Sequence, residues 1–267
     1  MQNRVSVAIV FLIVLFLVGV VLMVLARSRG ANAREACRNN LRLICQSLGY
    51  TKQANSQPID VKLELPAGTL PNPSLPPDQR LSWIASIQPE LSKRLDRASA
   101  WDAGSNAELS RTSVRTFICP ANPAIPPNTE PAFTHYVGAA GIAPHGPMAS
   151  LGPPVPTDVG CFRYDSSTPL HIIIDNDGLS NTILLGEVSD NLGPWIRGGS
   201  STLRPFDPAS DKPPIGIQGQ FGGNHSGVSA FAFADGSGRF LTDRINPGIL
   251  RGLFTIAGRE SDSLPNE

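Results

Sequence analysis

The sequence predicts an α+β protein in which a long N-terminal helix packs on an antiparallel β-sheet with long loops. Residues 5–25 form an apolar run without a charge, and residues 31–50 repeat apolar side chains at helical spacing. Short strand-like apolar runs dominate the rest of the chain. The 25 prolines and 25 glycines favour a loop-rich head over a helical one.

The apolar run is long enough to cross a lipid bilayer. About 20 apolar residues span the hydrocarbon core, and VSVAIVFLIVLFLVGVVLMVL contains no Asp, Glu, Lys or Arg. A cleavable signal peptide has a shorter apolar region of roughly 7–15 residues. We therefore expect residues 1–30 to be a permanent single-pass anchor, with the lipid bilayer as its partner. Cleavage at Ala31-Asn32-Ala33 is the alternative.

An amphipathic helix is predicted directly after the anchor. Its apolar positions recur at i, i+4, i+7, i+8 and i+11, and they are Cys37, Leu41, Ile44, Cys45 and Leu48. The helix is expected to cover residues 31–50 and to end near Gly49, with a kink at Gly30. The globular head is then predicted to cover residues 31–258, and residues 259–267 to form a disordered tail.

Local patterns predict the remaining elements of the head. Short helices are expected within residues 81–95, and a final helix is expected to be capped by Asn246 and ended by Gly258. Residues 228–241 predict a hairpin with a two-residue turn at Asp235-Gly236. Proline-rich residues 56–79 predict an extended linker, and residues 193–220 a long loop that binds or covers something. Other strands are expected at residues 112–118, 133–137, 160–164, 171–174 and 182–187.

The charge balance indicates no nucleic-acid partner, because 22 Lys and Arg residues face 22 Asp and Glu residues. Membrane orientation is harder to derive. Arginines are more frequent after the apolar run than before it, which by the positive-inside rule places the head in the cytoplasm. Long domains, however, are translocated largely regardless of flanking charge. Composition alone leaves the orientation open.

The cysteines do not predict a metal site, because the chain has no C-x-x-C pair. Cys37 and Cys45 are eight positions apart on one predicted helix, about 12 Å by rise alone, which is too far for a disulfide. We expect them to be buried thiols on the helix face. Cys119 and Cys161 can form a disulfide if the head is exported.

No catalytic residue is predicted. His225, Ser226 and Asp235 are the residue types of a nucleophilic triad, but adjacent Ser and His side chains point to opposite sides of a strand. A G-x-S-x-G pattern is also lacking. We therefore expect His225 to pack beside the hairpin and Asp235 to shape its own turn.

Two further groups of residues have a functional and a structural interpretation. Asp175 and Asp177 offer oxygen ligands that suit calcium, but Gly178 comes too early for an EF-hand loop. Turn formation is the favoured explanation, and no other cofactor is expected. The tryptophans Trp83, Trp101 and Trp195 are expected to pack in the core, with stacking on a glycan as the alternative.

Several segments resemble, in order, a large family of planctomycete proteins that have a prepilin-type N-terminus and a main domain of unknown function. His225 and Asp235-Gly236 are separated by nine residues, which is the family's H-x9-D-G signature. Asn39, Asn40 and Leu41 lie in A-R-E-A-C-R-N-N-L, which is similar to the family's A-R-E-A…C-x-N-N-L helix. The other similar segments are Ser82-Trp83-Ile84, Trp101-Asp102, Asn106, Phe117-Ile118-Cys119-Pro120, Tyr136-Val137-Gly138, DGLSNTILLGE at residues 177–187, and Pro194-Trp195.

The resemblance implies a pilin-like head outside the cytoplasmic membrane, on a stem like that of type IV pilins and pseudopilins. Family members often begin with a basic leader followed by G-F-T-L-x-E. Residues 1–10 have no Gly-Phe junction, and the apolar run has no acidic residue. We therefore expect a pilin-derived subunit that stays uncut in the membrane.

The expected function is that of a non-enzymatic, membrane-anchored pilin-like or pseudopilin-like protein of the cell envelope. Its role is expected to be structural, or related to secretion or the cell surface, with other pilin-like subunits as partners through the N-terminal helix. Two alternatives stay open. One is a glycan- or peptide-binding module that uses the 193–220 loop, and the other is an envelope hydrolase that uses His225.

Overall fold

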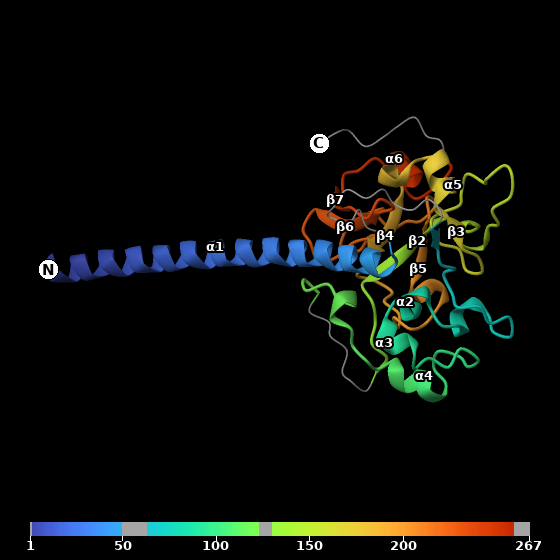
Figure 1. Ribbon diagram of the computed structural model, residues 1–267. Helices are drawn as coiled ribbons and strands as arrows, with labels where there is room; N and C mark the ends of the chain where they lie inside the picture. Colours follow the sequence, from blue (N-terminus) through green and yellow to red (C-terminus); the bar gives the residue numbers. More distant parts are fainter. Residues whose placement is uncertain (1, 50–62, 123–129, 259–267) are drawn as a thin grey trace.

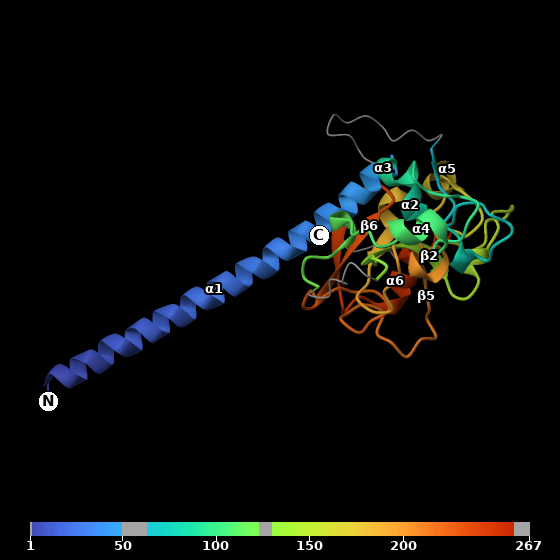
Figure 2. The ribbon, with the colours of Figure 1, turned by 90° about the horizontal axis from the view of Figure 1, so that it is seen from below.

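The computed structural model describes residues 2–49, 63–122 and 130–258, with side chains from residue 11 onward. Helix α1 (Gln2–Ser47) projects from a globular α+β head, which confirms the predicted fold class (Figure 1). Its 46 residues give a length of about 69 Å. Both views show α1 as one uninterrupted helix, so the expected kink at Gly30 is wrong (Figure 2).

The first part of α1 carries an exposed apolar surface. Between Phe11 and Leu25, the exposed fractions of the large apolar side chains range from 42% at Val20 to 71% at Phe16. This part of α1 is long and apolar enough to cross a membrane, and it is the one such segment in the described part of the chain. The predicted anchor is therefore a candidate membrane span.

The last turns of α1 belong to the core of the head. Cys37, Leu41, Ile44 and Cys45 are at most 1% exposed, and Leu48 packs beside them. This face of α1 contacts the strands β6 and β7 and the short helix η2. The predicted amphipathic pattern is thus confirmed, and Gly49, with a φ of 81°, follows the helix end in the left-handed conformation.

A five-stranded sheet forms the centre of the head, in the order β5-β2-β4-β6-β7. Neighbouring strands are antiparallel except β2 and β5, which pair in parallel, so the sheet is mixed rather than wholly antiparallel. The strands are β2 (Tyr136–Ile142), β4 (Ile183–Glu187), β5 (Leu203–Phe206), β6 (Val228–Phe233) and β7 (Gly238–Thr242).

Strand β5 lies inside the segment 193–220 that was expected to be a loop. Its sequence Leu-Arg-Pro-Phe has no alternation of apolar and polar residues, and proline is uncommon in a strand. The strand forms at the edge of the sheet, where Leu203 and Arg204 pair with β2. Pairing with a distant strand, which local sequence cannot encode, makes this segment extended.

The predicted hairpin is present, but its turn is longer than expected. Strand β6 ends at Phe233 and β7 begins at Gly238, and three residues, Ala234, Asp235 and Gly236, lie between the hydrogen-bonded pair Phe233 and Ser237. The amide of Gly236 donates to the carbonyl of Phe233, and the amide of Phe233 donates to the carbonyl of Ser237. Gly236 has a φ of 79°, as the third position of this turn requires.

Three other predicted strands are wrong. Residues 112–118 contain the 3₁₀ helix η2 (Arg115–Phe117), residues 160–164 are in no strand, and residues 171–174 lie in helix α5 (Leu170–Asp175). The run of isoleucines in α5 suggested a strand because β-branched residues favour strands. Its buried residues, Leu170 and Ile173, instead have helical spacing.

The remaining elements are short. As predicted, two helices lie within residues 81–95, and Asn246 caps α6, where its Oδ1 accepts from the amide of Gly248 at 2.7 Å. Helix α6 ends at Leu253, earlier than the expected Gly258. The segment 63–79 is described and the segment 56–62 is not, and the predicted tail 259–267 also lies outside the described residues. The short helices and strands outside the central sheet are β1 (Glu64–Leu65), η1 (Pro77–Gln79), α2 (Trp83–Ser86), α3 (Pro89–Ser92), α4 (Gly104–Leu109), η3 (Gly146–Met148), β3 (Thr168–Pro169), η4 (Leu179–Asn181), η5 (Gly199–Ser201) and α6 (Pro247–Leu253).

Apolar clusters cover both faces of the sheet. One cluster joins the buried face of α1 to Trp83, Phe162 and Trp195. The other packs Phe206, Phe221, Phe231, Phe233 and Phe254 together with residues of α6. Helix α1, the stem helix, therefore contributes one layer to the core of the head. Its first buried residue, Cys37, faces the sheet.

Candidate metal centre

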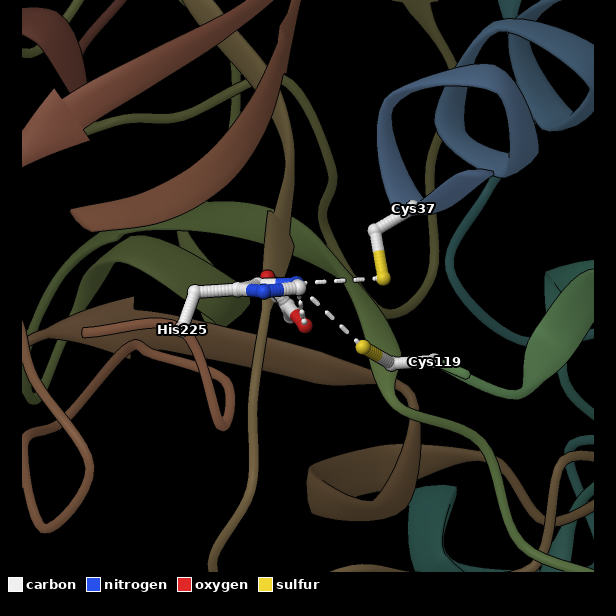
Figure 3. A group of neighbouring side chains, drawn as sticks. Cys37, Cys119 and His225 are labelled. Atoms are coloured by element: carbon white, nitrogen blue, oxygen red, sulfur yellow. Dashed lines mark hydrogen bonds and ion pairs between the residues drawn. The ribbon is translucent and has the colours of Figure 1, made fainter. Parts of the chain in front are cut away.

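Four buried side chains of metal-ligating types meet where α1 reaches the sheet (Figure 3). Cys37 comes from α1, Cys119 follows η2, Glu187 ends β4, and His225 precedes β6. One donor atom from each residue lies within 4.8 Å of all the others. Within residues 11–49, 63–122 and 130–258, no other group of three or more His, Cys, Asp or Glu side chains comes together in this way.

Local backbone features bring the four side chains together. Cys37 is the first buried position of the amphipathic face of α1. The loop that carries His225 can approach Glu187 because it contains Gly223. A Cβ atom at Gly223 would lie 2.0 Å from Oε1 of Glu187, well inside van der Waals contact. A side chain at this position would have to displace the carboxylate, so Gly223 permits the close approach.

The imidazole of His225 is the centre of the group. Its Nε2 atom lies 3.2 Å from Sγ of Cys37, 3.4 Å from Sγ of Cys119 and 3.5 Å from Oε1 of Glu187. The side chains of His225 and Glu187 are 2% and 0% exposed. Oε2 of Glu187 accepts from the amide of Ala230 at 3.2 Å, whereas Oε1 makes no hydrogen bond of good geometry.

Burial and close contact shift the acid–base equilibria of this group. Burial raises the pKa of Glu187 to about 7. The hydrogen bond between the two thiols lowers the pKa of Cys37 to about 5 and raises the pKa of Cys119. Burial opposes the charged form of His225, but contacts with Cys37 and Glu187 outweigh it and raise the pKa of the imidazole. Except at Cys37, these shifts favour the protonated forms, so a cation bound at the donor atoms would displace protons.

A second layer of polar groups holds the cysteines in place. The hydroxyl of Tyr136 is hydrogen-bonded to Cys37, and Nδ2 of Asn40 lies 3.3 Å from that hydroxyl. Nδ1 of His135 accepts from the amide of Cys119 at 3.2 Å. Burial lowers the pKa of His135 to about 4, so its ring is neutral and Nδ1 is free to accept. Both thiols are therefore positioned by polar contacts as well as by packing.

The possible disulfide between Cys119 and Cys161 is not present in the structure, where all four cysteines are free and buried. Cys119 lies against His225 instead. The expectation that Cys37 and Cys45 are buried thiols on the helix face is confirmed, since both are 0% exposed. Only one of the two, Cys37, reaches the four-residue group.

The triad of the hydrolase alternative is not assembled. Ser226 is exposed whereas its neighbour His225 is buried. Oδ1 of Asp235 accepts from the amide of Ser237 at 2.9 Å, so Asp235 shapes its own turn as expected. His225 does not simply pack beside the hairpin, which corrects the sequence-based expectation. It contacts the two thiols and Glu187.

The calcium candidates do not gather into a site among the described residues. Asp175 is exposed on α5. Oδ2 of Asp177 accepts from the amide of Gly258 at 2.9 Å and lies 3.5 Å from Oγ1 of Thr255. Asp177 thus joins the segment after α6 to the turn after α5 by hydrogen bonds, which is a structural role rather than calcium binding.

Two of the three tryptophans are core residues. Trp83 and Trp195 are 0% exposed, and their Nε1 atoms donate to the carbonyls of Thr202 and Thr112. Trp101 is half-buried, with the guanidinium of Arg197 at 5.8 Å from the ring centroid. Trp83 and Trp195 are therefore not available to stack on a glycan, and the expectation that they pack in the core is confirmed.

Sequence reasoning missed the four-residue group because its members are far apart in the chain, at positions 37, 119, 187 and 225. A search for closely spaced ligand pairs detects only sites whose ligands are local in sequence. The sequence indicated this group in another way, through the segments that resemble the family. Each of the four residues lies in one of the separate segments that carry the family resemblance.

Residues 31–212 match a family model described as a protein of unknown function, DUF1559. The matched region includes Cys37, Cys119 and Glu187 and ends before His225 and the H-x9-D-G segment. No curated protein and no solved structure gives a significant match to the chain. Because the family model covers more than half of the length of the chain, the chain belongs to the DUF1559 family of proteins of unknown function.

Proposed function

We propose that this protein is a non-enzymatic, single-pass protein of the cytoplasmic membrane, built like a pilin or pseudopilin, with its head on the outer side. The observation that carries this proposal is the continuity of α1. One helix of 46 residues provides both an exposed apolar segment and a core layer of the head. Anchor and head therefore form one structural unit.

The exposed apolar segment of α1 supports the bilayer as the partner of this protein. The large apolar side chains from Phe11 to Leu25 are 42–71% exposed. Burying such a side chain stabilises by roughly 1.5–3 kcal/mol, and soluble proteins rarely expose a continuous apolar patch of this kind. A lipid environment removes this surface from water.

The geometry of the stem supports a head that lies close to the membrane surface. From Leu25 to Cys37 the helix rises about 18 Å, and no break occurs at Gly30. This stretch exposes Arg27 and Arg29, which suits contact with anionic lipid headgroups. The head is thereby held close to the bilayer surface. The exposed part of α1 is also the surface through which other pilin-like stems are expected to pack.

Labelling of intact cells tests the anchor and its orientation. The four native cysteines are buried, so Ser74→Cys in the exposed loop before η1 introduces one accessible thiol. We expect an alkali-resistant membrane fraction in which an impermeant maleimide labels S74C on intact spheroplasts, while the wild type stays unlabelled. A soluble protein, or labelling of S74C only after lysis, contradicts the proposal.

Two measurements test the pilin-like part separately. Mass spectrometry of the mature N-terminus is expected to find no cleavage after a glycine. In membranes, cysteine cross-linking at Ser28→Cys on the exposed side of α1 is expected to give dimers, whereas S74C on the head gives none. Equal cross-linking at both positions contradicts packing through the stem and leaves the anchor intact.

A further inference from the structure

We infer that Cys37, Cys119, Glu187 and His225 form a tetrahedral zinc site that fastens the stem helix to the head. This inference goes beyond the proposed function and does not depend on membrane orientation. It rests on four features of the group: the distances between its donor atoms, its burial, the chemistry of the donors, and the charge around them.

The distances from Nε2 of His225 to the other three donors are close to those of a tetrahedral zinc centre, and all four donors lie within 4.8 Å of one another. Zinc lies about 2.3 Å from a thiolate sulfur and about 2.0–2.2 Å from a nitrogen or a carboxylate oxygen. In a tetrahedron these bond lengths separate neighbouring donors by about 3.4–3.8 Å. Nε2 of His225 lies 3.2, 3.4 and 3.5 Å from the donors of Cys37, Cys119 and Glu187. Small shifts of side chains then suffice to place the ion.

Burial makes the site costly without a cation. All four residues are at most 4% exposed, and Oε1 of Glu187 has no hydrogen bond of good geometry. A buried carboxylate oxygen that lacks a hydrogen bond is only partly compensated for its lost hydration, here by the charge contact with His225. This atom faces Nε2 of His225, so an ion held by the other three donors lies within its reach.

The donor set selects zinc over the alkaline-earth ions. Thiolate and imidazole ligands suit zinc, whereas calcium and magnesium prefer six or more oxygen donors. Four protein donors also complete the tetrahedron, and no position is left for water or substrate. Sites of this closed type stabilise a fold rather than catalyse a reaction.

The surrounding charge is compatible with the bound ion. Two thiolates and one carboxylate carry three negative charges, so a zinc ion leaves one negative charge on the centre. Nη2 of Arg34 donates to the carbonyl of Ser226 at 3.0 Å, next to His225. The hydroxyl of Tyr136 is hydrogen-bonded to Cys37, and the amide of Ala230 donates to Glu187. Such outer contacts orient zinc ligands and tune their affinity.

Metal analysis of the full-length protein in detergent micelles tests this inference. The wild type, purified without chelators from zinc-supplemented cells, is expected to contain about one zinc ion per chain by plasma mass spectrometry. Cys119→Ser and His225→Ala are expected to bind zinc at least about tenfold more weakly. Cys161→Ser, a buried thiol outside the group, and His171→Ala, an exposed histidine, are the matched controls and are expected to keep the ion.

Two further measurements keep the test valid if a variant fails to fold. Glu187→Gln preserves the size of the side chain and is expected to reduce zinc affinity while the far-ultraviolet circular dichroism stays unchanged. In the wild type, cobalt(II) is expected to give the intense visible bands of a tetrahedral thiolate complex, and added zinc is expected to abolish them. Chelation is expected to make Cys37 and Cys119, but not Cys161, reactive toward iodoacetamide.

Several results overturn the inference. A folded wild type that binds neither zinc nor cobalt shows that the group is a metal-free network of shared protons. Equal loss of zinc in C161S and C119S assigns the effect to general destabilisation. A Cys37–Cys119 disulfide in the protein purified without added oxidant, detected by mass spectrometry, shows that the thiols have a different role.

Discussion

Nε2 of His225 lies 3.2 Å from Sγ of Cys37, although 188 positions separate the two residues in the chain. The contact joins the stem helix to the loop before the last hairpin. The buried face of α1 is therefore tied to the core of the head through this loop. Any change that weakens this junction is expected to loosen the stem and the sheet together.

Removal of zinc is expected to lower the stability of the full-length protein. An ion present at 100 times its dissociation constant stabilises the folded state by about 2.7 kcal/mol. Thermal unfolding in micelles, with zinc and with a chelator, measures this difference. H225A serves as the control, because its melting temperature is expected not to respond to the chelator. An equal response of wild type and H225A contradicts a specific site.

Asn106→Ala is expected to destabilise the head by about 2–3 kcal/mol. Oδ1 of this fully buried amide accepts from the amide of Asp96 at 3.0 Å, and Nδ2 donates to the carbonyls of Asp96 and Ala100. Truncation leaves these backbone groups unpaired. Urea unfolding measures the change, and Glu108→Gln, exposed on the same helix α4, is expected to have no effect. Equal stability of N106A and wild type contradicts a structural role for the amide.

Gly160→Ala is expected to destabilise the head by about 3 kcal/mol or more, because a Cβ atom at this position would lie 2.0 Å from the amide nitrogen of Gly141. The obstacle is backbone, which cannot move aside as a side chain can. Gly152→Ala is the control, since its Cβ meets nothing within 4 Å. Soluble yield and thermal unfolding compare the two variants, and similar values for both refute this close approach.

Substitution of Gly236 is expected to show a graded effect on stability. The residue has a φ of 79° at the third position of the hairpin turn. A side chain in this left-handed conformation costs about 1–2 kcal/mol, and less for asparagine. Gly236→Val is therefore expected to lower the melting temperature more than Gly236→Asn. The reverse order contradicts the three-residue turn.

Elements with a strong local signal were predictable from the sequence. The face of α1 from Cys37 to Cys45 was predictable because a helix buries residues at a fixed period. The cap at Asn246 was predictable because the residue bonds within its own turn. Strand β5 and helix α5 were not predictable, because sheet pairing and the burial of Leu170 and Ile173 override weak local preferences.

By itself, the sequence determined the apolar segment, the amphipathic half of α1, the α+β class and the final hairpin. Each of these depends on periodic patterns within one segment. Only the tertiary structure decided which thiols meet. It placed Cys119 beside Cys37 and His225 rather than in a bond with Cys161. The physical reason is that the four donor residues come from four elements, and their distances are set by the packing of α1 on the sheet.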